Sequence, residues 1–225
     1  MRKLLLGTLL AASVSILSAG TIITEEAPGQ TTSTVAGATN IVTFNALSAG
    51  AFSGSTSIGT YTKGGTIVSP GDEFSGDASN YIAVGSQSGG AGSYSVGFNG
   101  QQTYFGFLWN ALDSSNSFTL FDNGTAVLTL NSSNFTGLAA GYLGNPSTKF
   151  KGQDGSEDFF FINIFATGNT VFTSATFSNG GNTGFETDNH TLLASTVPEP
   201  STYGMLFAGL SALGFVARRR SARKA

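Results

Sequence analysis

The chain has 225 residues, among them 31 Gly, one His and no Cys, and its formal net charge is −3. Without Cys there can be no disulfide framework, thiolate metal site or Cys nucleophile, and one His excludes any site built on two imidazoles. Charged residues amount to 10% and aromatic residues to 12%, which is unlike an acidic disordered chain and favours a folded β domain.

The N-terminus has the organisation of a secretory signal peptide at residues 1–20. Arg2 and Lys3 are followed by a mostly apolar stretch at 4–17 and then by small residues of the kind that signal peptidase accepts. The apolar stretch is shorter than the ~20 residues needed to span a membrane. We therefore predict that this segment is cleaved and that residues 21–40, rich in Thr, Gly and Ala, form a linker.

Residues 41–193 alternate short apolar runs with turn residues, a pattern typical of antiparallel β structure. Tyr94, Val96 and Phe98 are separated by small or polar residues, which gives the period of two of a half-buried strand. The pair Asn123-Gly124 between two apolar runs indicates a type I′ hairpin turn, because both residues tolerate a positive φ. The sequence therefore predicts an all-β ectodomain, an antiparallel two-sheet sandwich that is jelly-roll-like, with Phe side chains filling the space between the sheets.

The predicted domain is more acidic than the whole chain. Between Thr21 and Val197 there are three Lys, no Arg and twelve Asp or Glu, a formal charge of −9. Such a domain repels phosphate backbones, which argues against a nucleic-acid partner, and it lacks the Arg that anion recognition uses. Cations, neutral sugars or a polymer matrix are the expected partners.

Carboxylates in two places are candidate ligands for calcium, which takes six to eight oxygens. Asp154, Glu157 and Asp158 lie in a long Gly-rich irregular stretch, whereas Glu186 and Asp188 would share one face of a strand because side chains alternate along it. If that face is buried, two carboxylates without a cation would be costly. Calcium is therefore a candidate cofactor, and carboxylates on a solvent-exposed face are the alternative.

The sequence offers no catalytic constellation. His190 has Asp188 nearby, but no Gly-x-Ser-x-Gly elbow accompanies them, and we expect an exposed histidine at a strand end. Glycosidase chemistry needs two acids about 5–10 Å apart, and nothing in the sequence sets one acid opposite another. Tyr104 and Trp109 are candidate sugar contacts if they face outward, although the excess of Phe over Trp favours core packing.

The C-terminus combines three parts in a fixed order. A linker at 194–202 holds a Pro-Glu-Pro motif, an uncharged apolar stretch follows at 203–217, and a basic tail occupies 218–225. The apolar stretch predicts a short transmembrane helix, and the positive-inside rule keeps the tail in the cytoplasm with the domain outside. The motif residues are Val197, Pro198, Glu199 and Pro200, and the basic tail begins with Arg218, Arg219 and Arg220.

Together these parts resemble the PEP-CTERM sorting signal of exported bacterial proteins. The resemblance covers about residues 197–225. It implies that exosortase, a membrane enzyme of Gram-negative bacteria that make exopolysaccharide, recognises and processes the protein. The alternative is a plain C-terminal anchor that needs no processing, and whether the tail is cut, transferred or retained stays open.

Two further segments are similar to parts of exosortase-dependent surface proteins and of jelly-roll modules from carbohydrate-binding proteins. Phe185–Asn189 resembles the last strand of such modules and would pair with Thr43-Phe44-Asn45, and Tyr104–Trp109 resembles a central strand. The resemblance implies a non-catalytic surface or extracellular-matrix protein, with adhesion through exopolysaccharide in a biofilm, or through calcium, as its expected role. The alternative is a secreted glycan-active enzyme that carries the same signal.

Overall fold

The computed structural model describes the chain at residues 16–18, 20–27, 29–68, 79–86, 91–110, 112–135, 159–181 and 183–194. The chain divides into two compact units, Met1–Leu193 and Ala194–Ala225. The described residues are almost all in the first unit. The sorting motif, the predicted transmembrane helix, the basic tail and most of the predicted signal peptide therefore lie outside the described residues.

The described part of the first unit is built of antiparallel strands, with one short 3₁₀ turn, η2 (Ser132–Asn134). This confirms the all-β, antiparallel prediction. The strands are β1 (Ile16–Ser18), β2 (Thr21–Glu25), β3 (Asn40–Val42), β4 (Gly50–Ser55), β5 (Gly59–Val68), β6 (Tyr81–Gly85), β7 (Ser93–Gln102), β8 (Tyr104–Asn110), β9 (Asn116–Asp122), β10 (Thr125–Asn131), β11 (Phe160–Ala166), β12 (Phe172–Asn179) and β13 (Gly184–Leu192).

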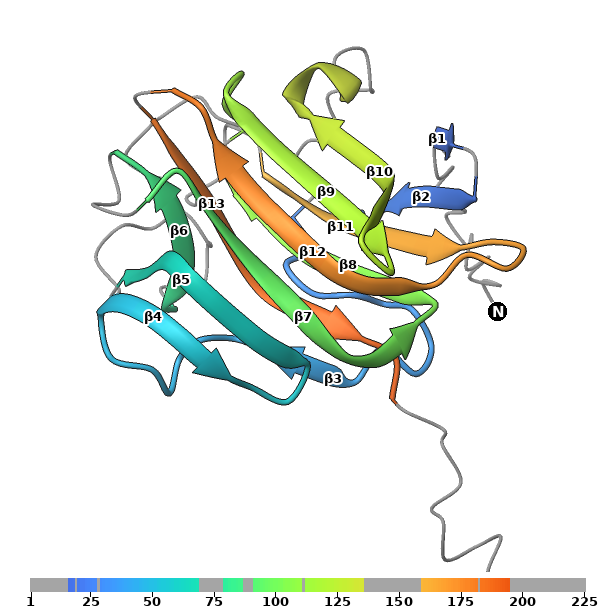
Figure 1. Cartoon of the computed structure of the whole chain (residues 1–225), viewed down its shortest axis with the longest axis horizontal. Coiled ribbons are helices and arrows are strands. Elements are labelled where there is room, and N and C mark those ends of the chain that lie inside the picture. The colour runs from blue at the N-terminus through green and yellow to red at the C-terminus, as the bar shows by residue number, and fades with distance from the viewer. Residues whose placement is uncertain are drawn as a thin grey trace, which may run out of the picture. The chain divides into compact units, whose positions relative to one another are not determined.

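The strands form one continuous hydrogen-bonded sheet rather than the two separate sheets that were predicted. Its order is β1-β2-β11-β8-β13-β6-β5-β7-β12-β9-β10, with β3 added to β13 and β4 added to β5. In Figure 1 the ribbons of β7, β12 and β9 lie across those of β8 and β13, so the sheet folds over into two layers. The layers stay joined through β6 and β5, and a jelly-roll connection is not confirmed.

The long strand β5 explains why the sheet is not divided. Its last residues, Thr66–Val68, pair with β6, while its first residues, Gly59–Tyr61, pair with β7. Between them Gly64 has a φ of 131°, and a Cβ there would overlap the carbonyl oxygen of Ser93. Since only Gly tolerates both the conformation and the close approach, this position lets one strand bend from one layer into the other.

Aromatic side chains fill the space between the layers, as the Phe content predicts. The ring centroids of Phe107 on β8 and Phe118 on β9 are 4.7 Å apart, and those of Phe105 and Phe118 are 5.9 Å apart. Phe177 on β12 packs edge-on against Phe107 at 5.1 Å. Tyr94 is 1% exposed on β7, where it also faces this core. The two layers are therefore held together by a continuous aromatic cluster.

The predicted hairpin turn is confirmed. Asn123 and Gly124 have φ values of 46° and 84° between β9 and β10, whose ends pair as Thr125 with Asp122. These positive values are the ones that a type I′ turn needs at its two central residues.

The structure differs from the predicted linker at residues 21–40. Thr21–Glu25 form β2, which pairs with β11, and Ile23 is 1% exposed in the core. Beyond β2, the Glu26 carboxylate accepts bonds of 2.7 Å from both the backbone N–H and the hydroxyl of Thr34. The Ile-Ile-Thr run at 22–24 is β-branched and alternates between core and outer positions, which favours a strand over a linker.

The last strand pairs near its end with β3, so an early segment does meet the last strand as the resemblance implied. The residues differ, however, because His190 lies opposite Val42 and Leu192 opposite Asn40. Phe44, two residues beyond, has a φ of 56°, a conformation that ends regular pairing.

Candidate functional site

Three ionisable side chains that could take part in binding or catalysis lie on β13, in the middle of one layer. This strand pairs with β8 on one side and with β6 on the other, and β3 adds to its end. All nine of its residues are buried, among them Glu186, Asp188 and His190 at 5%, 0% and 0% exposure. A central strand covered on both faces therefore carries the ionisable groups that sequence reasoning singled out.

A β-bulge sets the direction of these side chains. The pairing of β13 with β8 shifts between Asp188 and Thr191, and Asn189 in between has a φ of 52°. Asn tolerates this left-handed conformation better than most residues. Because the bulge adds one residue, Thr187 and His190 can contact each other, with 2.9 Å between Nε2 and Oγ1.

His190 is a core residue rather than the exposed strand-end histidine that was predicted. Its Nδ1 is 2.7 Å from the hydroxyl of Tyr61, and its ring stacks on Phe177 at 5.0 Å between centroids. Burial lowers the pKa of His190 to about 3, so the imidazole is neutral at pH 7. With both ring nitrogens bonded inside the core, the imidazole has no free position for a substrate.

The two acids of β13 face away from this core. Glu186 lies opposite Asn110 of β8, and Asp188 lies opposite Leu108, which belongs to a separate apolar cluster with Phe159 and Phe161. The structure therefore confirms that Glu186 and Asp188 share one face of the strand, and it shows that this face is buried.

Asp188 accepts hydrogen bonds from a side chain and from the backbone on that face. It accepts from the Ser79 hydroxyl at 2.9 Å and from the Asn189 backbone N–H at 2.7 Å. Within the described ranges, no group of three or more His, Cys, Asp or Glu could hold a metal ion. The other candidate ligands, Asp154, Glu157 and Asp158, lie outside the described residues.

Neither candidate sugar contact faces outward. Tyr104 and Trp109 are both 0% exposed on β8, which is buried along its whole length. The Tyr104 hydroxyl donates to Asn163 Oδ1 and lies 2.7 Å from Ser33 Oγ, while the Trp109 ring packs on Phe185 at 4.6 Å. The reason is that Trp109 lies on the core side of β8, while Ser33 and Asn163 lie against Tyr104 on the other side.

A pocket of about 270 Å³ opens beside β3 and the end of β4. It is lined by Ile41, Val42, Thr43, Phe44, Asn45, Ala46, Leu47, Ser55, Thr56 and Ser57. None of these side chains is an acid, a base or a nucleophile that titrates near neutral pH. The pocket therefore offers polar and apolar contacts but no group for acid–base catalysis.

Sequence reasoning missed the exposed surface of the other layer. On β7, β12, β9 and β10 the outward positions are mostly Ser and Thr, and they align in cross-strand rows: Thr176 lies opposite both Ser95 and Thr119, and Thr119 lies opposite Thr129. Short contacts link these hydroxyls, with 2.6 Å from Ser95 to Thr176 and 3.2 Å from Thr119 to Thr129. We call this surface the hydroxyl face.

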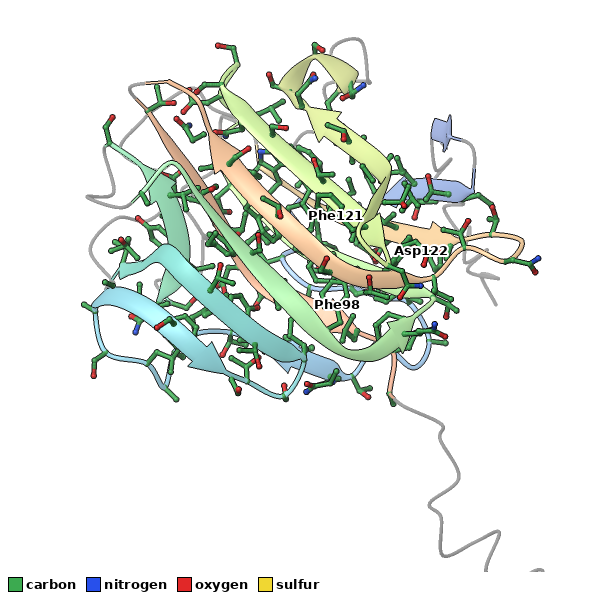
Figure 2. The ribbon with its side chains drawn as sticks, in the orientation of Figure 1. Phe98, Phe121 and Asp122 are labelled. Atoms are coloured by element: carbon green, nitrogen blue, oxygen red, sulfur yellow. The ribbon has the colours of Figure 1, made fainter. Side chains whose placement is uncertain are left out.

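The hydroxyl face contains one outward aromatic ring and few charges. Phe121 of β9 lies opposite Ser174 of β12 and is half-buried, and Figure 2 shows it beside Asp122 close to the turn into β10. Across β4, β5, β7, β9, β10 and β12 the charged residues are Lys63 and Asp122. The signal for this surface was the Ser/Thr alternation in Ser93–Gly97 and Ser174–Ser178, which was interpreted only as strand pattern.

The described residues form an antiparallel β domain, and Ala194–Ala225 form a second compact unit of the chain. A family model of the PEP-CTERM protein-sorting motif matches residues 196–220, which include the Pro-Glu-Pro motif and the first basic residues of the tail. The chain thus carries this motif at its C-terminus, as the resemblance indicated. The motif implies export, processing by exosortase and sorting to the cell surface.

No curated protein and no solved structure matches the chain. In the part of the chain that the structure describes, no helix is long and apolar enough to cross a membrane. The predicted transmembrane helix at 203–217 lies outside that part.

Proposed function

We propose that this protein is a non-catalytic component of the cell surface or extracellular matrix, delivered by exosortase, that adheres to neutral exopolysaccharide through the hydroxyl face. The observation that carries the adhesive role is the row pattern of partly exposed Ser and Thr on four adjacent strands, next to one outward Phe. Each hydroxyl both donates and accepts hydrogen bonds, as the hydroxyls of a sugar do.

The charge distribution supports a neutral partner. The hydroxyl face has no charged residue on β7, β12 or β10, and Asp122 at the end of β9 already accepts bonds from the Val171 backbone and the Asn123 carboxamide. A surface of this kind attracts neither phosphates nor polycations over a distance, so contacts depend on hydrogen bonds and on stacking. Phe121 supplies the apolar platform for one sugar ring.

The burial of the reactive residues supports a non-catalytic role. His190 and Asp188 are both 0% exposed, and their hydrogen bonds connect them to Tyr61, Thr187, Ser79 and the backbone. The pocket beside β3 has no acid or base in its lining. Adhesion requires none of these groups, whereas hydrolysis of a glycan requires two acids that reach the substrate.

The sorting role is tested by intact mass in a Gram-negative host that contains exosortase. The full-length protein is compared with a variant in which Pro198, Glu199 and Pro200 are all replaced by Ala. We expect the wild-type protein at the cell surface or in the medium without its basic tail, and the variant in the membrane with the tail retained. A wild-type chain that keeps Arg218–Ala225 in the membrane would contradict the sorting proposal.

The adhesive role is tested by co-sedimentation of the surface-extracted protein with exopolysaccharide from the same host. Phe121→Ala and Thr176→Glu should each reduce retention several-fold, whereas Phe121→Trp should keep or increase it. Ser48→Glu, an exposed change away from these strands, is the matched control and should leave retention unchanged. Equal retention of Phe121→Ala, Thr176→Glu and the control would sink the assignment of this face.

A further inference from the structure

Strand β2 becomes the end strand of the sheet if the predicted signal peptide is removed. In the sheet order β2 lies between β1 and β11, and β1 pairs with it through Ser18 opposite Thr21. Figure 1 shows β1 beyond β2 at one end of the sheet. Because β1 lies inside the predicted signal peptide at residues 1–20, cleavage after Gly20 removes it. The outer edge of β2 is then left without a strand.

The outer edge of β2 presents the backbone groups of every second residue. On the inner side, the Glu26 N–H donates to the Phe161 carbonyl at 3.0 Å, so the even-numbered residues face β11. Backbone groups point to alternating sides along an antiparallel strand. Thr21, Ile23 and Glu25 therefore direct their N–H and C=O groups to the outer edge. An open edge of this kind is a template for pairing with a strand of another chain.

The inward side chains of β2 include two polar atoms without partners. Thr21, Ile23 and Glu25 are 1%, 1% and 8% exposed, and Ile23 belongs to the main apolar core. In the part of the chain that the structure describes, Thr21 Oγ1 and Glu25 Oε2 are buried and have no hydrogen-bond partner. This state is unfavourable for both groups. A hydroxyl donor and a carboxyl acceptor are thus placed two residues on either side of Ile23.

A second copy of this chain would supply both missing partners. When two β2 strands pair antiparallel with Ile23 opposite Ile23, Thr21 of each copy lies opposite Glu25 of the other. Opposite residues project to the same side of the sheet with Cβ atoms about 4.5–5.5 Å apart, so the hydroxyl can donate to the carboxyl. The backbone suits this register, because residues that all face the shared edge form hydrogen-bonded pairs. The pairing is twofold-symmetric, so both contacts form together.

Charge favours this arrangement over pairing with the opposite end of the sheet. Cleavage after Gly20 leaves on Thr21 an α-amino group that carries a positive charge at neutral pH. In the twofold register this group lies beside Glu25 of the other copy, and opposite charges at short range attract. The strand at the other end of the sheet, β10, has no charged residue. It therefore offers the amino group no counter-charge.

We propose that the exported protein forms a twofold-symmetric dimer through the edge of β2, and that β1 covers this edge until the signal peptide is removed. Two paired strands of five residues are a small contact beside the ~1,600 Å² of a standard interface, so the dimer should be weak and form at high local concentration. In dilute solution the monomer prevails, and Glu25 Oε2 is again without a partner. The contact contains no residue of the hydroxyl face, so adhesion and dimerisation can be tested separately.

Disulfide cross-linking detects a weak dimer and tests its register, because the chain has no Cys of its own. The register places Ile22 of one copy opposite Thr24 of the other as a non-hydrogen-bonded pair, with Cα atoms about 4.5 Å apart, close enough for a disulfide. Exported Ile22→Cys and Thr24→Cys proteins, each without residues 1–20, are mixed and oxidised. We expect a mixed disulfide at least fivefold above the dimers that either protein forms alone, and intact mass identifies it.

Thr129→Cys, at an exposed position of β10, is the matched control. Mixed with Ile22→Cys, it should give only background cross-linking. A disulfide between Ile22→Cys and Thr24→Cys that is no stronger than this background would overturn the proposal. If Thr24→Cys cross-links with itself as well as with Ile22→Cys, the twofold register is wrong.

Retention of β1 tests the covering role. In cells that contain both variants, inhibition of signal peptidase keeps residues 1–20 on the chain, and the mixed disulfide should be lost because β1 occupies the edge. Undiminished cross-linking would contradict this role. A wild-type exported protein that keeps residues 1–20 would overturn the dimer itself, since its β2 edge would never open.

Sedimentation equilibrium at increasing concentration measures the contribution of charge. Glu25→Lys places a cation beside the Thr21 amino group of the other copy, so the dissociation constant of the dimer should rise at least tenfold. Asp122→Lys makes the same change of charge at the turn after β9 and should leave the constant unchanged. Equal constants for Glu25→Lys and the wild type would show that Glu25 does not contact the second copy. The cross-linking result does not depend on whether Glu25→Lys folds.

Discussion

Polar side chains are buried in one layer of this sheet and partly exposed in the other. In the layer of β8 and β13, every residue of both strands is buried, so polar side chains have no access to bulk water. In the layer of β9 and β12, buried and partly exposed positions alternate, and the outward hydroxyls remain accessible. Polar side chains of the first layer can therefore bond only inside the protein, whereas those of the second layer can also reach solvent.

This difference explains where each kind of function can arise. In the buried layer each polar group needs a partner inside the protein, as Tyr104 finds in Asn163 and as His190 finds in Tyr61. On β8, the Trp109 Nε1 and the Asn110 carboxamide are buried without a hydrogen-bond partner. In the exposed layer water satisfies the hydroxyls until a partner replaces it. Binding at the surface thus costs little reorganisation.

The largest effect should come from comparing one aromatic residue in each layer. Trp109→Ala removes a fully buried ring that packs on Phe185 at 4.6 Å, and we expect it to lower the free energy of unfolding by about 3–5 kcal/mol. Phe121→Ala removes a half-buried ring from the outward side of β9, and we expect a loss of about 1 kcal/mol or less.

Chemical denaturation of the two variants, followed by circular dichroism, checks this comparison. Phe118→Ala is a second core control on the same strand as Phe121, because Phe118 is 0% exposed. If Phe121→Ala costs as much as Phe118→Ala, the outward side of β9 is not a free surface and the contrast between the layers fails.

The next effect is a dependence of stability on pH that comes from His190. Burial lowers its pKa to about 3 in the folded protein, against 6.5 in the unfolded chain. On acidification the unfolded chain takes up the proton first, so the stability contributed by neutral His190 is complete above pH 6.5. It is then lost as the pH falls towards about 3, at up to about 1.4 kcal/mol per pH unit.

A His190→Gln variant isolates this contribution, because it keeps the other ionisable groups. Its free energy of unfolding should be lower than that of the wild type at pH 7, but the difference should shrink steadily as the pH is lowered to 4. Urea denaturation at several pH values measures both curves. Parallel curves for the two proteins would show that His190 is protonated equally in both states and is not closed inside the core.

The strands and their turns could be predicted from the sequence because the pattern that specifies them is local. Tyr94, Val96 and Phe98 alternate with small residues, and Asn123-Gly124 tolerates positive φ, so each element is encoded within a few residues. The single folded-over sheet could not be predicted, since it depends on Gly64 meeting the carbonyl of Ser93, about thirty positions away along the chain.

The candidate site was predicted only in part for the same reason. The common face of Glu186 and Asp188 follows from alternation along one strand and was therefore foreseeable. The position of Asn110 opposite Glu186 was not, because it depends on the register between β8 and β13. The bulge at Asn189, which lets His190 reach Thr187, also depends on pairing with a partner strand rather than on local pattern.

The smallest effect compares two adjacent acids at the start of the domain. Glu26 accepts bonds from Thr34 and from Asn163, whereas Glu25 Oε2 is buried without a partner. Burial raises the pKa of Glu25 to about 7, so the folded protein holds this proton more tightly than the unfolded chain does. The stability linked to that proton is complete below pH 4.5 and is lost as the pH rises through 7. We expect Glu25→Gln to raise the free energy of unfolding by about 1–2 kcal/mol at pH 8 and to change it little at pH 4, because an amide needs no proton to stay neutral.

Glu26→Gln should destabilise the protein at pH 8, since it weakens charge-assisted bonds to Thr34. Urea denaturation at both pH values distinguishes the two, and a Glu25→Gln protein that is less stable than the wild type at pH 8 would mean that Glu25 is ionised and paired in solution.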